Sequence, residues 1–202
     1  ALAAQALALE QEQDGLQAQL AGVESELADI QAQSEGSQTA LAEINRQLAD
    51  ARIAAGLAAV HGPGVVIEIA DSRRVVPAGA NPANYIVLAD DLRDLVVALW
   101  NAGAEAIAIN GERLVATSSI YGVGSSVLVN TAFLSPPFRV EAIGPRDLEA
   151  QFRKDPAYLG RVAQRIEAFD LEFATLSADD LQLPPFIGST SLRWAVPSEA
   201  AP

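Results

Sequence analysis

The sequence predicts an α+β protein in which a long N-terminal coiled-coil helix precedes a domain of split-βαβ type. Three observations predict this fold class. An apolar heptad repeat runs from about residue 2 to residue 58, a Gly-Pro break follows it, and strand-like and helix-like segments then alternate. We therefore expect a coiled-coil helix at 1–60, an α/β domain at 61–196 and a frayed tail at 197–202.

The heptad repeat keeps one phase over about eight heptads, which is typical of a coiled-coil seam. At about 1.5 Å per residue such a helix is about 80 Å long, too long to fold onto a small domain. The seam needs a second helix to cover it, and a homodimer is the default partner because the mixed apolar residues specify oligomer number weakly. The residues expected at this interface are Leu16, Leu20, Val23, Leu27, Ile30, Leu41, Ile44 and Leu48.

The repeat is weakest at residues 33–37, where both seam positions are serine and Gly36 lies between them. Glycine inside a helix costs about 1 kcal/mol relative to alanine. The helix either folds back on itself here or continues as one rod. The unchanged phase after Gly36 favours the rod, and both interpretations remain open at this point.

The composition excludes several functions. A formal net charge of −13 and a pI near 4.3 argue against binding nucleic acid or an anionic membrane surface. The absence of cysteine excludes disulfides and thiolate metal sites. No run of 18 apolar residues is present, although a removed membrane anchor would sit before a coiled coil that begins without methionine.

The segments after the heptads alternate between strand and helix patterns. The helix is expected to end near His61, where Gly62 and Pro63 would stop it. The expected elements that follow are a strand at 65–70, a helix at 85–101, a hairpin of 105–109 with 112–118 around Asn110-Gly111, strands at 126–130 and 138–143, helices from about 146 and from 156 to about 168, and a strand at 170–176. Their order is that of a ferredoxin-like layer with helices on one face. The proline-rich segment 183–186 is expected to lie against this domain.

Residues 100–113, which read WNAGAEAIAINGER, resemble the signature of the YlxW/YlxX-like proteins of Gram-positive bacteria, a family of unknown function. Residues 62–65, 137–138, 142–144 and 183–186 extend the resemblance over 60–196. It implies an N-terminal transmembrane helix, a coiled coil and an extracytoplasmic ferredoxin-like domain, similar in layout to PilO-type scaffold proteins. It also implies a single-pass cell-membrane location, an envelope or divisome partner, and no recognised catalytic residues.

No catalytic, cofactor or metal site is predicted. Adjacent acids such as Asp90-Asp91 point about 100° apart on a helix and do not converge on one ion, whereas Asp179-Asp180 could cap a helix after Ser177. The glycine-rich stretch 122–126 lacks the lysine of a phosphate loop and is expected to be a loop or bulge. His61 is the single histidine and is assigned to the end of the helix.

Two polar clusters are candidates for contacts with a partner. Asn110, Glu112 and Arg113 are expected at the tip of the hairpin. Either Asn110-Gly111 only makes the turn, or this cluster makes a polar contact with a partner or a second copy. Arg73-Arg74 is the only pair of adjacent arginines and is either a solvated loop or a steering site for an acidic partner.

These patterns favour a non-enzymatic scaffold in which the coiled coil sets oligomeric state and distance from the membrane and the domain docks a partner. The alternative is a small-ligand-binding domain or enzyme that uses the cleft between the sheet and the loop at 71–84. A third interpretation pairs the helical arm with a different coiled-coil protein.

Overall fold

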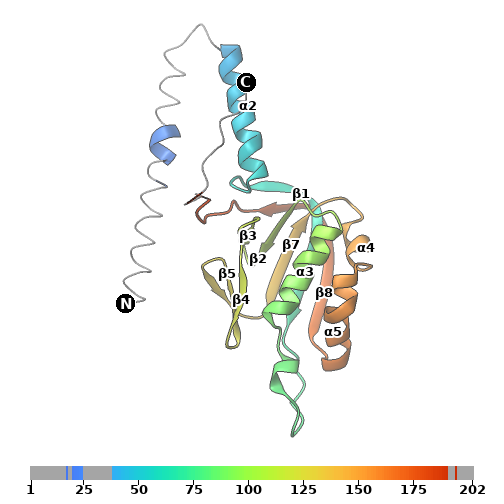
Figure 1. The fold of residues 1–202 in the computed structure, drawn as a ribbon. Helices are drawn as coiled ribbons and strands as arrows, with labels where there is room; N and C mark the ends of the chain where they lie inside the picture. The colour runs from blue at the N-terminus through green and yellow to red at the C-terminus, as the bar shows by residue number, and fades with distance from the viewer. Residues whose placement is uncertain (1–16, 18–19, 25–37, 191–193, 195–202) are drawn as a thin grey trace, which may run out of the picture. The chain divides into compact units, whose positions relative to one another are not determined.

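The computed structural model describes residues 17, 20–24, 38–190 and 194. The chain divides into two compact units, one of residues 1–51 with 188–202 and one of residues 52–187. The second unit contains two antiparallel sheets and five helical segments, so the α+β class is confirmed (Figure 1). The described residues do not include a long N-terminal coiled coil. Gly36, where the helix was expected either to fold back or to continue, also lies outside the described residues.

Helix α2 spans Gln38–Ala54 and ends earlier than the sequence predicted. Gly56 adopts a left-handed φ of 74°, and its N–H donates to the carbonyl of Ile53 at 2.9 Å. A side chain at Gly56 would lie 2.5 Å from Val115 Cγ1, so glycine also allows a close approach here. The predicted helix end near His61 is therefore wrong, because Gly56 stops the helix before Gly62 and Pro63 are reached.

Strand β1, Val60–Ala70, begins at the residues that were expected to end the helix. His61, Gly62 and Pro63 all lie in this strand, which pairs with strand β8 on one side. The register shifts between Gly62 and Gly64, which places Pro63 at an irregular point of the ladder. A proline there removes no regular ladder hydrogen bond, so Pro63 does not interrupt the strand.

The main sheet has the order β3-β2-β7-β1-β8, and all four neighbouring pairs are antiparallel. The strands not yet defined are β2 Ala106–Ile109, β3 Glu112–Leu114, β7 Phe138–Ile143 and β8 Glu172–Leu183. Asn110 and Gly111 have φ of 48° and 84°, the positive values that a type I′ turn requires. The predicted hairpin is thus confirmed, with a second strand shorter than expected.

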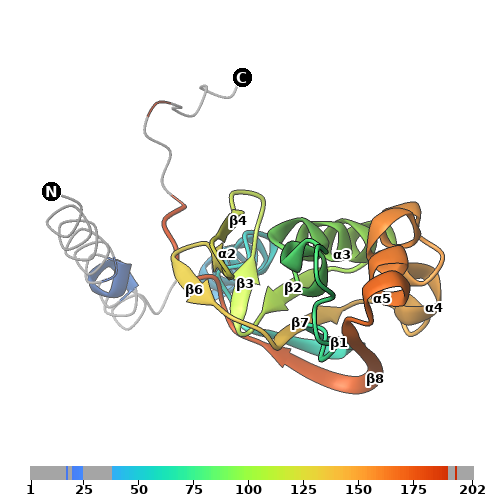
Figure 2. The ribbon, with the colours of Figure 1, turned by 90° about the horizontal axis from the view of Figure 1, so that it is seen from below.

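The helices cover one face of this sheet (Figures 1 and 2). Their bounds are η1 Pro82–Tyr85, α3 Ala89–Asn101, α4 Leu148–Phe152, the π-helix η2 Tyr158–Val162 and α5 Ala163–Phe169. Helix α3 begins four residues later than predicted, because the Asp91 carboxylate accepts a hydrogen bond from the N–H of Leu88 and caps the helix there.

A second sheet of three strands, β4-β5-β6, lies beside the first. Its strands are β4 Ile120–Val123, β5 Ser126–Val129 and β6 Ala132–Leu134. Gly124 has a φ of 63° and closes the turn between β4 and β5, so most of the glycine-rich stretch is a tight hairpin. Strand β4 packs on α3, where the Arg93 guanidinium donates to the carbonyl of Ile120 at 3.1 Å.

Buried apolar side chains form one core on each face of the main sheet. The larger core joins the helices to the sheet and includes Val65, Ile67, Ile69, Leu92, Leu95, Leu99, Phe138, Val140 and Phe152. The smaller core lies on the opposite face and consists of Val66, Ala106, Ala108, Ile143, Leu181 and Leu183. The alternation in β1 between the two cores explains its continuous apolar run, because both faces of the strand are covered there.

Strand β8 is almost twice as long as predicted and includes Asp179 and Asp180. The predicted helix cap after Ser177 is therefore wrong, because these residues lie inside β8, at the point where its register with β1 shifts. The segment after β8 behaves as expected: Phe186 is buried, and its N–H donates to the carbonyl of Gly56 at 2.8 Å. The tail at 197–202 lies outside the described residues.

Candidate interaction surface

The outer edge of β8 is the longest open strand edge in the part of the chain that the structure describes. Strand β8 stands last in the sheet and pairs with β1 alone. Figure 2 shows it along the outside of the domain. The outward backbone N–H and C=O groups of an edge strand can pair with another strand. We call residues 172–180 the β8 edge.

Side chains along the β8 edge alternate between two environments. Thr175 and Ser177 point toward α4, where both hydroxyls donate to the Glu149 carboxylate at 2.6 and 2.5 Å. Leu176 points to the opposite face and leaves 67% of its surface exposed. Successive side chains of a strand point to opposite faces of the sheet, so neighbouring residues have different environments. The β8 edge therefore carries an exposed apolar residue at its middle.

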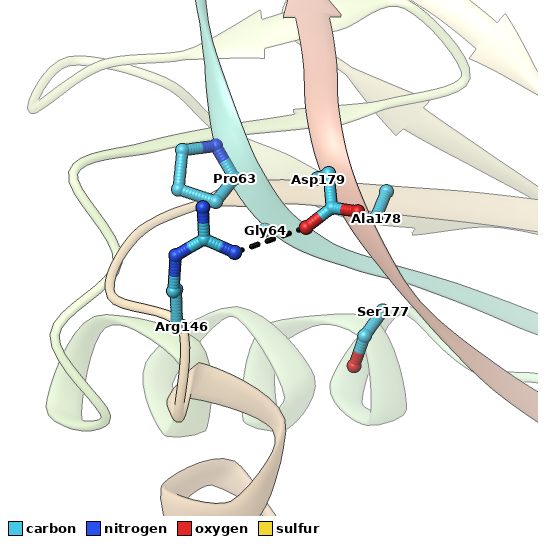
Figure 3. A pocket seen from close by; sticks show the side chains of 6 residues that line it. All are labelled: Pro63, Gly64, Arg146, Ser177, Ala178 and Asp179. Carbon is cyan, nitrogen blue, oxygen red and sulfur yellow. Dashed lines mark hydrogen bonds and ion pairs between the residues drawn. The ribbon is translucent and has the colours of Figure 1, made fainter.

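A small cavity of about 190 Å³ opens where the β1–β8 register shifts (Figure 3). Arg146 from the loop before α4 crosses it and forms an ion pair of 3.0 Å with Asp179. Both side chains are largely exposed, so this pair contributes little to stability. The cavity is lined by Pro63, Gly64, Arg146, Ser177, Ala178 and Asp179. The cavity adjoins the β8 edge, and Arg146, Ser177 and Asp179 give it a polar rim.

Glu149 joins α4 to the β8 edge, and its neighbours change the pKa of its carboxyl group. Hydrogen bonds from Ser177 and Thr175, with a smaller effect from Arg153, lower the pKa of Glu149 below its ordinary value. Its stabilising effect is therefore fully present above the carboxyl's pKa in the unfolded chain. It is lost as pH falls through the lower pKa of the folded state.

We expect the variant Glu149→Gln to unfold with a shallower pH dependence below about pH 4.5 than the unmodified chain. The amide cannot be protonated there, so this part of the acid destabilisation disappears. Urea unfolding at a series of pH values between about 3 and 6 measures it. Glu167→Gln on α5 is the matched removal of one carboxylate. An acid limb equally steep in all three proteins would contradict the assignment.

Arg113 lies in β3 and is buried, with 5% of its surface exposed. Its guanidinium donates to the carbonyls of Ala58 at 3.5 Å and Pro184 at 3.2 Å, while its Nε has no hydrogen-bond partner. Burial lowers the pKa of Arg113. Arg113 therefore holds the segments before β1 and after β8 against β3, and it is not available at the hairpin tip as predicted.

Asn110 also has an internal role. Its carboxamide oxygen accepts a hydrogen bond from the N–H of Arg139 at 2.6 Å, and its own N–H donates to the carbonyl of Arg139 at 2.8 Å. These bonds join the hairpin turn to the start of β7. The structure thus brings neither Asn110 nor Arg113 together with the β8 edge, which lies at the other end of the sheet.

This chain is similar to other bacterial proteins. A family model described as a bacterial protein of unknown function (DUF881) matches residues 47–196. The chain belongs to the DUF881 family. It is 36% identical over 97 residues to the UPF0749 protein YlxW of Bacillus subtilis, which covers 48% of this chain and 42% of that protein. The resemblance to YlxW-like proteins is thereby confirmed.

Other similar proteins come from Mycobacterium tuberculosis. The UPF0749 protein Rv1823 is 33% identical over 105 residues, covering 46% of this chain and 32% of that protein. The crystal structure of an uncharacterized conserved protein from the same organism superposes with a TM-score of 0.57 at 27% identity, covering 75% of this chain and 99% of that chain. The chain thus spans less than half the length of the curated relatives it matches.

The loop at 71–84, expected to border a ligand cleft, is held down in this DUF881 chain by Arg165 of α5. The Arg165 guanidinium forms an ion pair with the fully buried Asp91. It also donates to the carbonyls of Ala83 and Asn84 at 3.2 Å and of Ile86 at 2.9 Å. The sequence does not reveal this pair, because nothing in the local pattern distinguishes Asp91 from its half-buried neighbour Asp90.

The other polar residues that the sequence offered as candidates form exposed pairs. Arg73 pairs with Glu172, and Arg74 with Asp170 at 3.0 Å, so the two arginines attach their loop to the start of β8. His61 Nδ1 lies 2.9 Å from Asp180 Oδ1. Across the residues that the structure describes, no three His, Asp or Glu side chains form a group that could hold a metal.

The predicted coiled-coil residues are described only in part. Leu16, Leu27 and Ile30 lie outside the described residues. Leu20 and Val23 are exposed, and on α2 Leu41 is half-buried while Ile44 and Leu48 leave 54% and 44% of their surfaces exposed. Among the described helices none is both long and apolar enough to cross a bilayer.

Proposed function

We propose that this DUF881 protein is a non-enzymatic, envelope-associated scaffold. A coiled-coil arm sets its oligomeric state and its distance from the membrane, and a ferredoxin-like domain docks a partner of the envelope or division machinery. A membrane anchor N-terminal to Ala1 would hold the arm. The resemblance to YlxW-like proteins suggests the anchor and the envelope setting, and both are parts of the proposal.

The ferredoxin-like assignment is supported by the order of four strands and of the two groups of helices that connect them. Strands β1, β2, β7 and β8 stand in the sheet order β2-β7-β1-β8, and each neighbouring pair is antiparallel. Along the chain, α3 lies between β1 and β2, and α4 to α5 lie between β7 and β8. A split-βαβ domain has this connectivity. Strand β3 and the β4-β5-β6 sheet are additions to it.

The observation that carries the scaffold proposal is the apolar stripe on α2. Ile44 and Leu48 lie one turn apart and are exposed, although both belong to the predicted seam. Another side of the same helix holds Arg46, which forms ion pairs with Glu43 at 2.7 Å and Asp50 at 3.3 Å. An exposed apolar stripe beside a charged face is typical of a helix that packs on another helix.

We expect the full chain to be dimeric and the double variant Ile44→Lys/Leu48→Lys to be monomeric at micromolar concentration. Two buried lysines would oppose two more across the dimer seam, at a cost of several kcal/mol. Sedimentation equilibrium measures the mass of both proteins. Ala42→Lys/Ala49→Lys is the matched control: it adds the same charge to exposed positions of α2 outside the seam and should leave the dimer intact.

A full chain that is monomeric without any substitution would contradict self-association. The arm would then pair with a different coiled-coil protein, or not pair at all. Dissociation of the dimer in the Ala42→Lys/Ala49→Lys control would show that added charge, and not loss of the seam, drives separation.

A further inference from the structure

The two edges of the main sheet differ in how well they are protected. Strand β3 forms one edge and is three residues long, which leaves little backbone for another strand to pair with. Strand β8 forms the other edge with twelve residues and contains no proline or lysine, the residues that most often protect an edge. Its only irregularity is the register shift opposite Gly62 to Gly64. Residues 172–178 therefore present a regular ladder edge.

The side chains of this edge allow a second strand to approach. Leu176 is exposed at its middle, and its neighbours on the same face, Ala174 and Ala178, are small. A strand added beside β8 would bring its own side chains about 5 Å from these residues. It would cover Leu176 while meeting no bulky group on either side of it.

Charge indicates what kind of strand fits. Strand β8 carries Glu172, Asp179 and Asp180 and no basic residue, within a chain of formal net charge −13. The three acids pair with Arg73, Arg146 and His61, but each pair is exposed and therefore weak. A second copy would bring three more acids to the same edge, whereas a basic segment could replace these partners and complement the strand.

We propose that the β8 edge binds an extended segment of a partner protein as an added strand, and that this segment alternates lysine or arginine with apolar residues. The inference rests on the proposed scaffold function and specifies the chemistry of its partner. Backbone pairing supplies the binding mode, and the Asp179 rim of the cavity beside the edge selects a basic side chain.

The test uses the full chain and the peptide acetyl-Lys-Val-Lys-Val-Lys-Val-Lys-amide. Within residues 172–178, alternate N–H groups face away from β1. Amide hydrogen exchange of these outward N–H groups should slow at least about tenfold at saturating peptide, because the peptide backbone accepts hydrogen bonds from them. The same peptide N-methylated at alternate residues keeps its charge but cannot pair as a strand, and it should give no protection. The peptide with glutamate in place of lysine should also give none.

Two variants locate the site. Leu176→Lys places a positive charge at the middle of the edge and should weaken binding of the lysine peptide at least about tenfold. Leu159→Lys adds the same charge to η2, where Leu159 is also exposed, and should leave binding unchanged. Thermal unfolding of each variant verifies that it is folded.

Unchanged exchange at 172–178, or equal protection by the N-methylated or glutamate peptide, would overturn the proposal. So would a peptide-free dimer whose β8 amides are protected and which dissociates on Leu176→Lys, because a second copy would then occupy the edge. These outcomes are separate from the test of the arm: a dimer that depends on Ile44 and Leu48 supports the scaffold whatever the peptide does.

Discussion

Replacing Gly64 with alanine is expected to destabilise the domain by about 3 kcal/mol or more, the largest effect that we expect for any glycine among the residues that the structure describes. A Cβ at this position would lie 2.0 Å from the carbonyl oxygen of Ala142 and 2.9 Å from its carbon. Both are backbone atoms of β7, paired in register with β1 through Val65 and Gly64. Neither can move without opening the ladder at the centre of the sheet.

The measurement is the free energy of unfolding from urea titration of the full chain and of Gly64→Ala. Gly122→Ala in β4 is the matched control, because its added Cβ would lie 3.6 Å from Ala89 Cβ, an ordinary contact. We expect that variant to change stability by no more than about 1 kcal/mol in either direction. Equal stability of Gly64→Ala and the unmodified chain would show that β1 and β7 are further apart than described.

Replacing Arg165 with methionine is expected to cost about 3–5 kcal/mol, because it leaves the Asp91 carboxylate buried without a counter-charge. One Asp91 oxygen has no hydrogen-bond partner even in the intact protein. The three backbone carbonyls that Arg165 binds would also lose their donor. The loop before α3 should therefore loosen as stability falls.

Thermal unfolding of Arg165→Met should show a midpoint lower by about 10 °C or more. Arg161→Met is the matched control on η2: Arg161 pairs with Asp90 and Asp94 at an exposed position, so its loss should cost at most about 1 kcal/mol. The double variant Asp91→Asn/Arg165→Met should recover part of the loss, because no buried charge remains. Arg165→Met and Arg161→Met with the same midpoint would contradict the role of the buried pair.

Local signals in the sequence predicted the elements whose structure depends on nearby residues. Asn110-Gly111 between two apolar runs predicts a type I′ hairpin because both residues tolerate a positive φ, and the structure has this turn. The helical spacing of apolar residues likewise predicted α3, and a strand-like run predicted β7. Together these segments predicted the α+β class. These assignments need no knowledge of distant parts of the chain.

Predictions failed where a distant segment decided the outcome. Gly62 and Pro63 carry the pattern of a helix end, yet they lie inside β1, because β8 pairs with Gly62 and Gly64 on either side of Pro63 from more than a hundred residues away. Asp179 and Asp180 likewise have the local pattern of a helix cap, although they lie inside β8. A long ladder between two strands outweighs a local preference of about 1 kcal/mol.

The candidate site was predicted only in outline. The sequence indicated a scaffold with a sheet edge for docking, but it pointed to Asn110 and Arg113, and both are occupied by internal hydrogen bonds. The β8 edge can be identified only when the strand order is known, because the residues of a strand do not determine whether it lies at the edge or at the centre of a sheet.

The sequence by itself determined the class of the fold, its family and the hairpin turn, since each follows from residue types at short spacings. Tertiary structure alone decided that Asp91 and Arg165 are buried together, that Gly64 touches β7, and which strand is left with a free edge. Each of these depends on atoms that are far apart along the chain and adjacent only after folding, so no local pattern could reveal it.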